Sequence, residues 1–184
     1  MPNLPIFITG NDDKAKYLNN QLGISLEHRK VNLDEIQSLD LHEIVKHKLL
    51  QAYNTCNKPV LVEDVSLVFC ALNELPGPYI KWFVENAGDE ACCRLLDGFD
   101  DRSAIIRCTF GYYDGNNTKF FDSELNGSIA KKPQGRNGFG FDRFFINEGY
   151  KITRAEMSQE ENERTYAELM KPFSKVRDYL KTLQ

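Results

Sequence analysis

A polar segment near the N-terminus suits the binding of a phosphate. It follows a short apolar run, precedes a helical pattern, and consists of Thr9, Gly10, Asn11, Asp12, Asp13 and Lys14. A turn between a strand and a helix points free backbone N–H groups and the positive end of the helix at an anion. Lys14 adds a point charge, although the spacing of a P-loop is absent. The alternative interpretation is a plain turn between a strand and a helix.

Three acidic residues and one lysine are candidates for binding a metal ion or activating water. Glu63 and Asp64 follow the apolar run 59–62, which we expect to be a buried strand that ends there. Ligands of α/β sheets gather at the carboxyl ends of strands, but adjacent side chains point in opposite directions, so only one of these acids should face a given site. Glu35 is a further, isolated acid. Lys48 lies on the apolar stripe of its predicted helix, where it either reaches solvent from the edge of the core or meets an anion.

The glycine-rich segment 138–142 is a candidate for a nucleobase site. Glycines let the backbone approach a flat ligand closely, and the ring of Phe139 or Phe141 can stack on a base. The alternative is a turn whose phenylalanines fill the core. Taken together, the turn, the acids and this segment match the needs of a magnesium-dependent nucleotide hydrolase. Such an enzyme requires donors for the phosphates, carboxylates for the metal, a base for water and a stacking surface.

These residues should be positioned by a mixed sheet with helices on its faces, because the predicted elements are of mixed α/β type. Strands are expected at 4–9, 27–31, 59–62, 103–113, 118–129 and 144–146. Helices are expected at 12–22, 41–53, 80–86, 89–96 and 158–183. The last helix begins with a capping box made by Ser158 and Glu161. Residues 114–117 have the composition of a hairpin turn.

The composition restricts the class of protein further. The 184 residues carry a net charge of −4, with 41% apolar and 27% charged residues, which is typical of one soluble domain. A dedicated binder of nucleic acid polymers usually has a basic surface instead. No apolar stretch approaches the ~20 residues of a membrane span, and we expect no secretory signal. The five cysteines contain no C-x-x-C pair, so we expect reduced, buried thiols in a cytoplasmic protein and no zinc site.

In their order and spacing, the motifs resemble those of the inosine triphosphate pyrophosphatase family. The resemblance extends over about residues 6–157, and the motifs that carry it are 9–14, 35–37, 62–64, 75–83 and 139–142. The string Leu-Pro-Gly-Pro-Tyr-Ile-Lys-Trp-Phe at 75–83 is the most specific of them. The resemblance implies a single two-lobed domain over residues 1–184. Its elongated mixed sheet would be flanked by helices, with the active site in a central cleft.

The resemblance also implies an activity and a set of roles. The family hydrolyses noncanonical purine nucleoside triphosphates such as ITP, dITP and XTP to the monophosphate and pyrophosphate, which cleans the nucleotide pool. It implies Mg²⁺, with Mn²⁺ as a substitute, a cytoplasmic homodimer, and neither a nucleic acid polymer nor a membrane as partner. By position, Asp64 and Lys14 would be catalytic, Glu35 and Asp64 would bind the metal, and Lys81 would be a further cation. The substrate-binding residues would be Thr9, Gly10, Asn11, Asp12, Asp13, Lys14, Lys48, Val65, Phe139, Gly140, Phe141 and Asp142.

The chain departs from the family pattern at positions that matter for the base. Tyr17 stands where the family usually has an acid, and Asn162 stands where it has a lysine. Residues 166–168 read Tyr-Ala-Glu in place of Ser-His-Arg, with Arg164 as a candidate replacement at a different helical angle. A site that hydrogen-bonds the six-position oxygen of a purine can discriminate strongly, so these losses predict weaker or altered selectivity.

Two other functions stay open at this point. The first is a pyrophosphatase that acts on other or modified nucleotides, and the second is a non-catalytic nucleotide-binding homologue. A thiol enzyme built on Cys92 and Cys93 is disfavoured, because no histidine lies near them in the sequence.

Overall fold

Seven strands form one mixed sheet in the computed structural model, which describes residues 4–10 and 12–183, without the side chains of Asp12 and Asp13. The sheet has the order β2-β1-β3-β5-β6-β7, and β4 pairs with β3. β1 is parallel to β2 and β3, whereas the pairs β3–β4 and β6–β7 are antiparallel. The strands are β1 (Ile6–Ile8), β2 (His28–Arg29), β3 (Val60–Phe69), β4 (Pro76–Gly77), β5 (Ser103–Tyr113), β6 (Thr118–Ile129) and β7 (Phe145–Asn147). The predicted mixed α/β class is confirmed.

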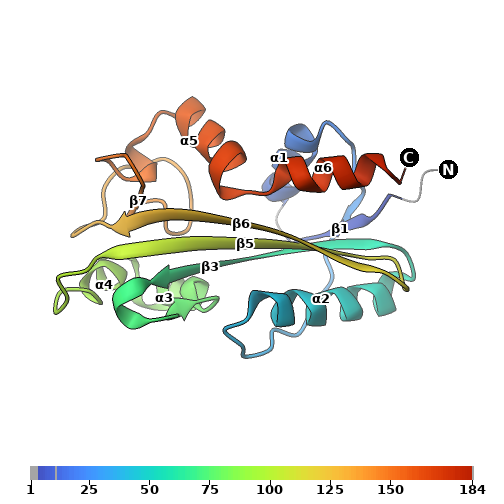
Figure 1. Ribbon diagram of the computed structural model, residues 1–184, viewed down its shortest axis with the longest axis horizontal. Helices are drawn as coiled ribbons and strands as arrows, with labels where there is room; N and C mark the ends of the chain where they lie inside the picture. Colours follow the sequence, from blue (N-terminus) through green and yellow to red (C-terminus); the bar gives the residue numbers. More distant parts are fainter. Residues whose placement is uncertain (1–3, 11, 184) are drawn as a thin grey trace. The chain divides into compact units, whose positions relative to one another are not determined.

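Six α-helices flank this sheet within the described residues (Figure 1). They are α1 (Asp12–Leu22), α2 (Leu41–Cys56), α3 (Ile80–Ala87), α4 (Asp89–Arg94), α5 (Gln159–Thr165) and α6 (Phe173–Lys181). α2 begins after Asp40, whose side chain accepts a hydrogen bond from the N–H of His42. It ends at Asn57, which adopts the left-handed conformation that closes many helices. None of the helices within 4–10 and 12–183 has the length and apolarity of a membrane span.

The chain divides into two compact units, of which the first comprises Met1–Asp64, Cys108–Asp122 and Lys171–Gln184. In this unit α2 lies on one face of the sheet, and α1 and α6 lie on the other (Figure 1). The alternation of β1 explains this arrangement, since its three residues are all buried. Ile6 and Ile8 join a core with residues of α2, whereas Phe7 stacks on Phe110, which in turn meets Phe173 of α6.

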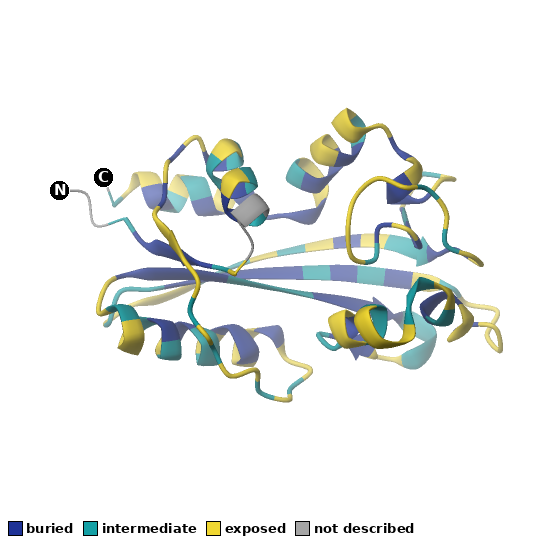
Figure 2. Ribbon diagram, turned by 180° about the vertical axis from the view of Figure 1, so that it is seen from behind, coloured by how far each residue is buried: buried dark blue, intermediate teal, exposed yellow. Residues whose placement is uncertain are grey.

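The second unit comprises Val65–Arg107 and Ser123–Met170. Here α3 and α4 lie on one face of the strands and α5 lies on the other (Figure 1). β3 contributes the longest run of buried strand residues in this unit, whereas β6 is largely exposed or half-buried, and the helices turn exposed stripes to solvent (Figure 2). The predicted single two-lobed domain with a central cleft is not tested by this division and stays a prediction.

β3 is longer than the sequence pattern indicates. The expectation that the strand ends at Glu63 and Asp64 is wrong, since β3 continues without a break to Phe69. The two acids can occupy the middle of a strand because each has a cationic partner there.

The expectation of one continuous C-terminal helix over 158–183 is also wrong. α5 ends at Thr165, a π-helical turn spans Tyr166–Met170, and α6 begins only at Phe173. Pro172 accounts for the interruption, because proline has no N–H to donate and disfavours a helical conformation at the residue before it. Ser158 does cap α5 by accepting from the N–H of Glu161, although the full capping box lies at Thr153 and Glu156.

Candidate active site

Glu63 and Asp64 belong to two separate clusters of ion pairs, both in the first unit. The two acids are consecutive on β3, so their side chains leave the strand in opposite directions, and their Cα atoms lie about 3.8 Å apart. Glu63 contacts two lysines, and we call these three residues the lysine-rich cluster (Lys14, Glu63 and Lys171). Asp64 shares a lysine with another acid, and we call these the acid-rich cluster (Glu35, Lys48 and Asp64). The two clusters therefore flank the same point of β3.

The lysine-rich cluster carries one more positive than negative charge. Lys14 Nζ lies 3.1 Å from Glu63 Oε2, and Lys171 Nζ donates to Glu63 Oε1. Glu63 and Lys171 are buried, whereas the side chain of Lys14 is 32% exposed. Burial alone would raise the pKa of Glu63, but the charges of Lys14 and Lys171 and their hydrogen bonds lower it to about 2. Lys14 is thus the cation of this cluster that an anionic ligand can reach.

The acid-rich cluster has the opposite balance, with two carboxylates against one ammonium group. Lys48 Nζ lies 2.6 Å from Asp64 Oδ2 and 3.3 Å from Glu35 Oε1. Burial alone would lower the pKa of Lys48, but Asp64 and Glu35 raise it above its ordinary value. Lys48 is therefore an ammonium ion at neutral pH and does not act as a base. The sequence left open whether the Lys48 side chain reaches solvent or meets an anion, and in the structure it meets the carboxylates of Asp64 and Glu35.

The ion pairs of Glu63 with Lys14 and Lys171 predict a loss of stability in acid. Because the pKa of Glu63 is about 2 in the folded protein and about 4.5 when exposed, its stabilising contribution is complete above the higher value. It should be lost as the pH falls from about 4.5 toward 2. Urea unfolding at a series of pH values measures this, and Glu63→Gln should show a flatter dependence over that window. An equal pH dependence in the two proteins would contradict the buried ion pair.

The acid-rich cluster fits a magnesium ion that also binds substrate. Within the described residues, no group of three or more His, Cys, Asp or Glu side chains could hold a metal ion alone. Magnesium needs only one or two carboxylates, because water and the phosphates of a substrate complete its octahedron. Glu35 and Asp64 already converge on one cation, the ammonium group of Lys48. The donor set therefore suits a metal–nucleotide complex and is too small for a resident structural metal.

The N-terminal turn is described only in part. The N–H of Thr9 donates to the carbonyl oxygen of Arg29 at 3.0 Å, which anchors the end of β1, and Gly10 is exposed. Asn11 and the side chains of Asp12 and Asp13 lie outside the described residues. The predictions for those three residues are therefore not addressed by the structure.

Two further residues predicted for the site, Val65 and Lys81, lie in the second unit. Val65 is half-buried at the position after Asp64. Lys81 is exposed in the first turn of α3. Its role as a further cation stays a prediction.

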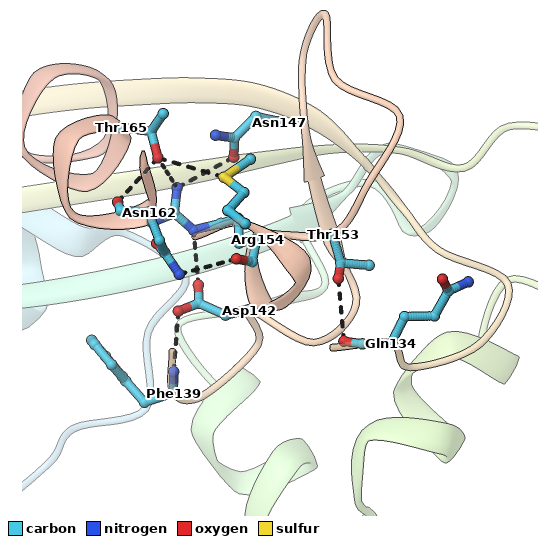
Figure 3. A network of polar contacts seen from close by, with 9 residues as sticks. Gln134, Phe139, Asp142, Asn147, Thr153, Arg154, Asn162 and Thr165 are labelled. Carbon is cyan, nitrogen blue, oxygen red and sulfur yellow. Dashed lines mark hydrogen bonds and ion pairs between the residues drawn. The ribbon is translucent and has the colours of Figure 1, made fainter. Parts of the chain in front are cut away.

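The second unit presents an exposed aromatic ring on a braced loop. Phe139 is 66% exposed, whereas Asp142, at the end of the same segment, is buried. Asp142 Oδ2 accepts a hydrogen bond from the N–H of Phe139 at 3.1 Å (Figure 3). Gly138 has a φ of +77°, and a Cβ there would collide with Asp142 Oδ2, so the tight turn requires glycine. Phe141 instead packs on Phe145, which leaves Phe139 as the ring available for stacking.

The residues that depart from the family pattern have structural partners of their own. Tyr17 packs against Phe173, with ring centroids 5.9 Å apart, so an apolar contact occupies the position of the expected acid. Asn162 is buried and bonds to Arg154. Arg164 pairs with Glu168 at 3.0 Å on the surface, and this contact gives no support to its role as a replacement base reader.

Sequence reasoning missed Lys171 and Arg154. The predicted helix 158–183 places Lys171 in its interior, although Pro172 directly after it signals a break. Arg154 lies in the Thr153-x-x-Glu156 pattern of a capping box, which could have identified an ordered turn at this point.

The three buried cysteines are poor candidates for a nucleophile. All five are free thiols. Burial raises the pKa of Cys92 to about 11 and those of Cys93 and Cys108 to about 12. Since only the thiolate is an effective nucleophile, the structure argues against a thiol enzyme built on Cys92 and Cys93.

Comparison with known proteins identifies the family. A sequence model of the Ham1 family matches residues 5–168. The chain belongs to the Ham1 family. Inosine triphosphate pyrophosphatase 2 of Trypanosoma cruzi is 42% identical to it over 161 residues, which cover 85% of this chain and 82% of that protein. Inosine triphosphate pyrophosphatase of Yarrowia lipolytica is 39% identical over 180 residues, with 95% and 94% covered. The resemblance inferred from the motifs is confirmed.

Solved structures of Ham1 proteins share the fold. The Ham1 protein of Staphylococcus aureus superposes with a TM-score of 0.83 at 23% identity, over 98% of this chain and all of that one. A Ham1 protein from Coxiella burnetii gives a TM-score of 0.80 at 22% identity, over 97% and 99% of the two chains. At these identities the likeness establishes the fold, and the assignment of the site depends on the residues described above.

Proposed function

We propose that this chain is a magnesium-dependent nucleoside triphosphate pyrophosphatase that hydrolyses deaminated purine nucleotides such as ITP, dITP and XTP to the monophosphate and pyrophosphate. The observation that carries the proposal is the division of charge around β3. A cluster with excess positive charge and a cluster with excess negative charge flank consecutive residues of one strand. A metal–triphosphate complex has matching parts, since its phosphates are anionic and its metal is cationic. The curated relatives named inosine triphosphate pyrophosphatase support the same activity.

The lysine-rich cluster suits the triphosphate. Lys14 is the accessible cation, and it lies in the first turn of α1, the end of a helix that favours an anion. Glu63 holds the ammonium group of Lys14 at 3.1 Å, which orients it before a substrate arrives. A positioned lysine stabilises the charge that accumulates on the leaving pyrophosphate, and it needs no reorganisation to do so.

The acid-rich cluster suits the metal and the attacking water. Glu35 and Asp64 would hold Mg²⁺, or Mn²⁺ in its place, and the ion when bound would neutralise phosphate charge and orient water. Asp64 is the better candidate for the base, because its carboxylate is more shielded from solvent than that of Glu35. It would accept the proton of a water molecule whose oxygen attacks the α-phosphorus. The bond from that phosphorus to the bridging oxygen breaks, and pyrophosphate leaves.

For the base, the exposed ring of Phe139 on its braced loop offers stacking. Stacking contributes about 1–3 kcal/mol for each base and depends little on which base it is. The triplet that would hydrogen-bond the six-position oxygen is absent from this sequence. The proposed site therefore binds purines well and distinguishes among them poorly.

A panel of nucleotides tests both the activity and this selectivity. With Mg²⁺ present, ITP, dITP and XTP should be hydrolysed with release of pyrophosphate, and chelation of the metal should stop the reaction. The ratio of kcat/KM for ITP to that for ATP should fall well below the roughly 10⁴-fold of sites built to hydrogen-bond a substrate group. Strong preference for ITP would show that other residues read the base. Thermal stabilisation by nucleotides without turnover would favour the non-catalytic homologue instead.

Several further properties remain part of the proposal. The family resemblance supports a homodimer, and the free thiols and the sequence pattern are compatible with a cytoplasmic location. The net charge of −4 favours a mononucleotide over a nucleic acid polymer as the substrate.

A further inference from the structure

The most extensive buried polar network of the second unit centres on Arg154. This side chain is fully buried, although arginine is among the residues least often found in that state. Its Nε donates to Asp142 Oδ1 at 2.8 Å, and its Nη2 donates to Asn162 Oδ1 at 2.6 Å (Figure 3). Longer contacts run from Nη1 to Asn147 Oδ1 and Thr165 Oγ1. A buried charge of this kind requires a paired anion and further acceptors, and both are present.

One path leads from Arg154 to the backbone of Phe139. Asp142 accepts from Arg154 through Oδ1 and from the N–H of Phe139 through Oδ2, so the carboxylate links the two residues. The N–H of Ala155 also donates to the carbonyl oxygen of Asp142 at 2.9 Å. The loop is thereby tied to the segment that carries Arg154.

A second path leads from Arg154 to the ring of Phe139. The guanidinium carbon lies 5.7 Å from the centre of the Tyr166 ring, within the range of a cation–π contact. Tyr166 in turn meets Phe139 edge to face, with ring centroids 5.9 Å apart. Arg154 thus supports both the backbone and the side chain of Phe139, the residue in this segment that is most open to a ligand.

We propose that Arg154 is a positioning residue that fixes Phe139 as a stacking platform for the nucleobase, a role that rests on the proposed function. Arg154 is enclosed by its partners and does not itself reach a ligand. It helps to hold the base through Phe139 and does not take over the reading of the six-position oxygen. Asn162, at the position of the expected lysine, serves as an acceptor for this cation. Because stacking is tolerant of base identity, Arg154 should affect all purine nucleotides alike.

The test compares Arg154→Gln with wild type on ITP and ATP at saturating Mg²⁺. We expect kcat/KM to fall roughly 5- to 100-fold for both nucleotides, mainly through KM, as loss of a stacking contact predicts. Inhibition by magnesium tripolyphosphate, which has no base, should be unchanged. Arg154→Lys, which keeps a cation beside Asp142, should give an intermediate loss and provides a second variant if Arg154→Gln does not fold. Arg143→Gln is the matched control, because it removes the same group from an exposed ion pair with Asp89.

A measurement on the free protein separates this proposal from the proposed function. The amide of Phe139 should exchange its hydrogen faster in Arg154→Gln and Arg154→Lys than in wild type, whether or not nucleotides are hydrolysed. Failure of wild type to hydrolyse any nucleotide would end the proposed function alone. Unchanged exchange at Phe139, a loss confined to ITP, or an equal loss of tripolyphosphate binding would each overturn the positioning role.

Discussion

Replacing Asp64 with Asn should lower kcat for ITP by about 10²- to 10⁴-fold, the range that a positioned base contributes. Asn keeps the shape of the side chain and still accepts a hydrogen bond from Lys48, which lies 2.6 Å from Asp64 Oδ2. The fold should therefore remain, while the group that takes the proton from water or holds the metal is lost. The measurement is the rate of pyrophosphate release at saturating ITP and Mg²⁺.

Comparison of Asp64→Asn with Glu35→Gln shows which acid acts as the base and which holds the metal. If Asp64 acts as the base and Glu35 alone holds the metal, Asp64→Asn should need no more Mg²⁺ than wild type for half-maximal rate, whereas Glu35→Gln should need more. If both acids hold the metal, both variants should need more Mg²⁺. Asp178→Asn, at an exposed position on α6, is the control and should behave as wild type. A wild-type kcat in Asp64→Asn would remove Asp64 from the reaction.

The second large effect concerns stability and lies at Glu63. Glu63→Gln leaves the ammonium group of Lys171 buried without a carboxylate, and breaking a buried pair in this way costs about 3–5 kcal/mol. For a chain of 184 residues this corresponds to a fall in Tm of roughly 6–20 °C. Thermal and urea unfolding followed by circular dichroism give both quantities.

The double variant Glu63→Gln/Lys171→Met should recover much of this loss, since replacing both buried charges is often nearly neutral. Glu74→Gln removes an acid from an exposed pair with Arg107 and should change the free energy of unfolding by less than about 1 kcal/mol. If Glu63→Gln unfolded at the wild-type temperature, or if the double variant were less stable than the single one, the buried pair would not contribute as described.

Local patterns were sufficient to predict most of the elements. The apolar stripe at 41–53 predicted the helix α2, and the turn composition at 114–117 predicted a hairpin. Its two strands, β5 and β6, have the predicted bounds. The spacing of Glu35, Lys48 and Asp64 in the sequence does not predict that their side chains form ion pairs. The resemblance singled out these residues for the site, and the strand alternation at 63–64 predicted only that the two acids would diverge.

The remaining features depend on contacts between distant parts of the sequence. Glu63 reaches Lys171 over 108 positions, and without that partner a glutamate inside a buried strand looks like the end of the strand. Arg154 is likewise unremarkable in the sequence, because its partners come from a loop, a strand and α5. Helical periodicity also continues through 166–172, although the α-helix is interrupted there. Residues 166–170 form a π-helical turn, and α6 begins only after Pro172.

The position of the attacked phosphorus tests the central claim most directly. Hydrolysis of ITP with Mg²⁺ in water enriched in ¹⁸O should place the label in the inosine monophosphate and leave the pyrophosphate unlabelled, because water attacks the α-phosphorus. Label in the pyrophosphate would mean attack at the β-phosphorus. Release of labelled orthophosphate would mean attack at the γ-phosphorus. The first of these results would contradict the proposed attack at the α-phosphorus, and the second would contradict the pyrophosphatase activity itself.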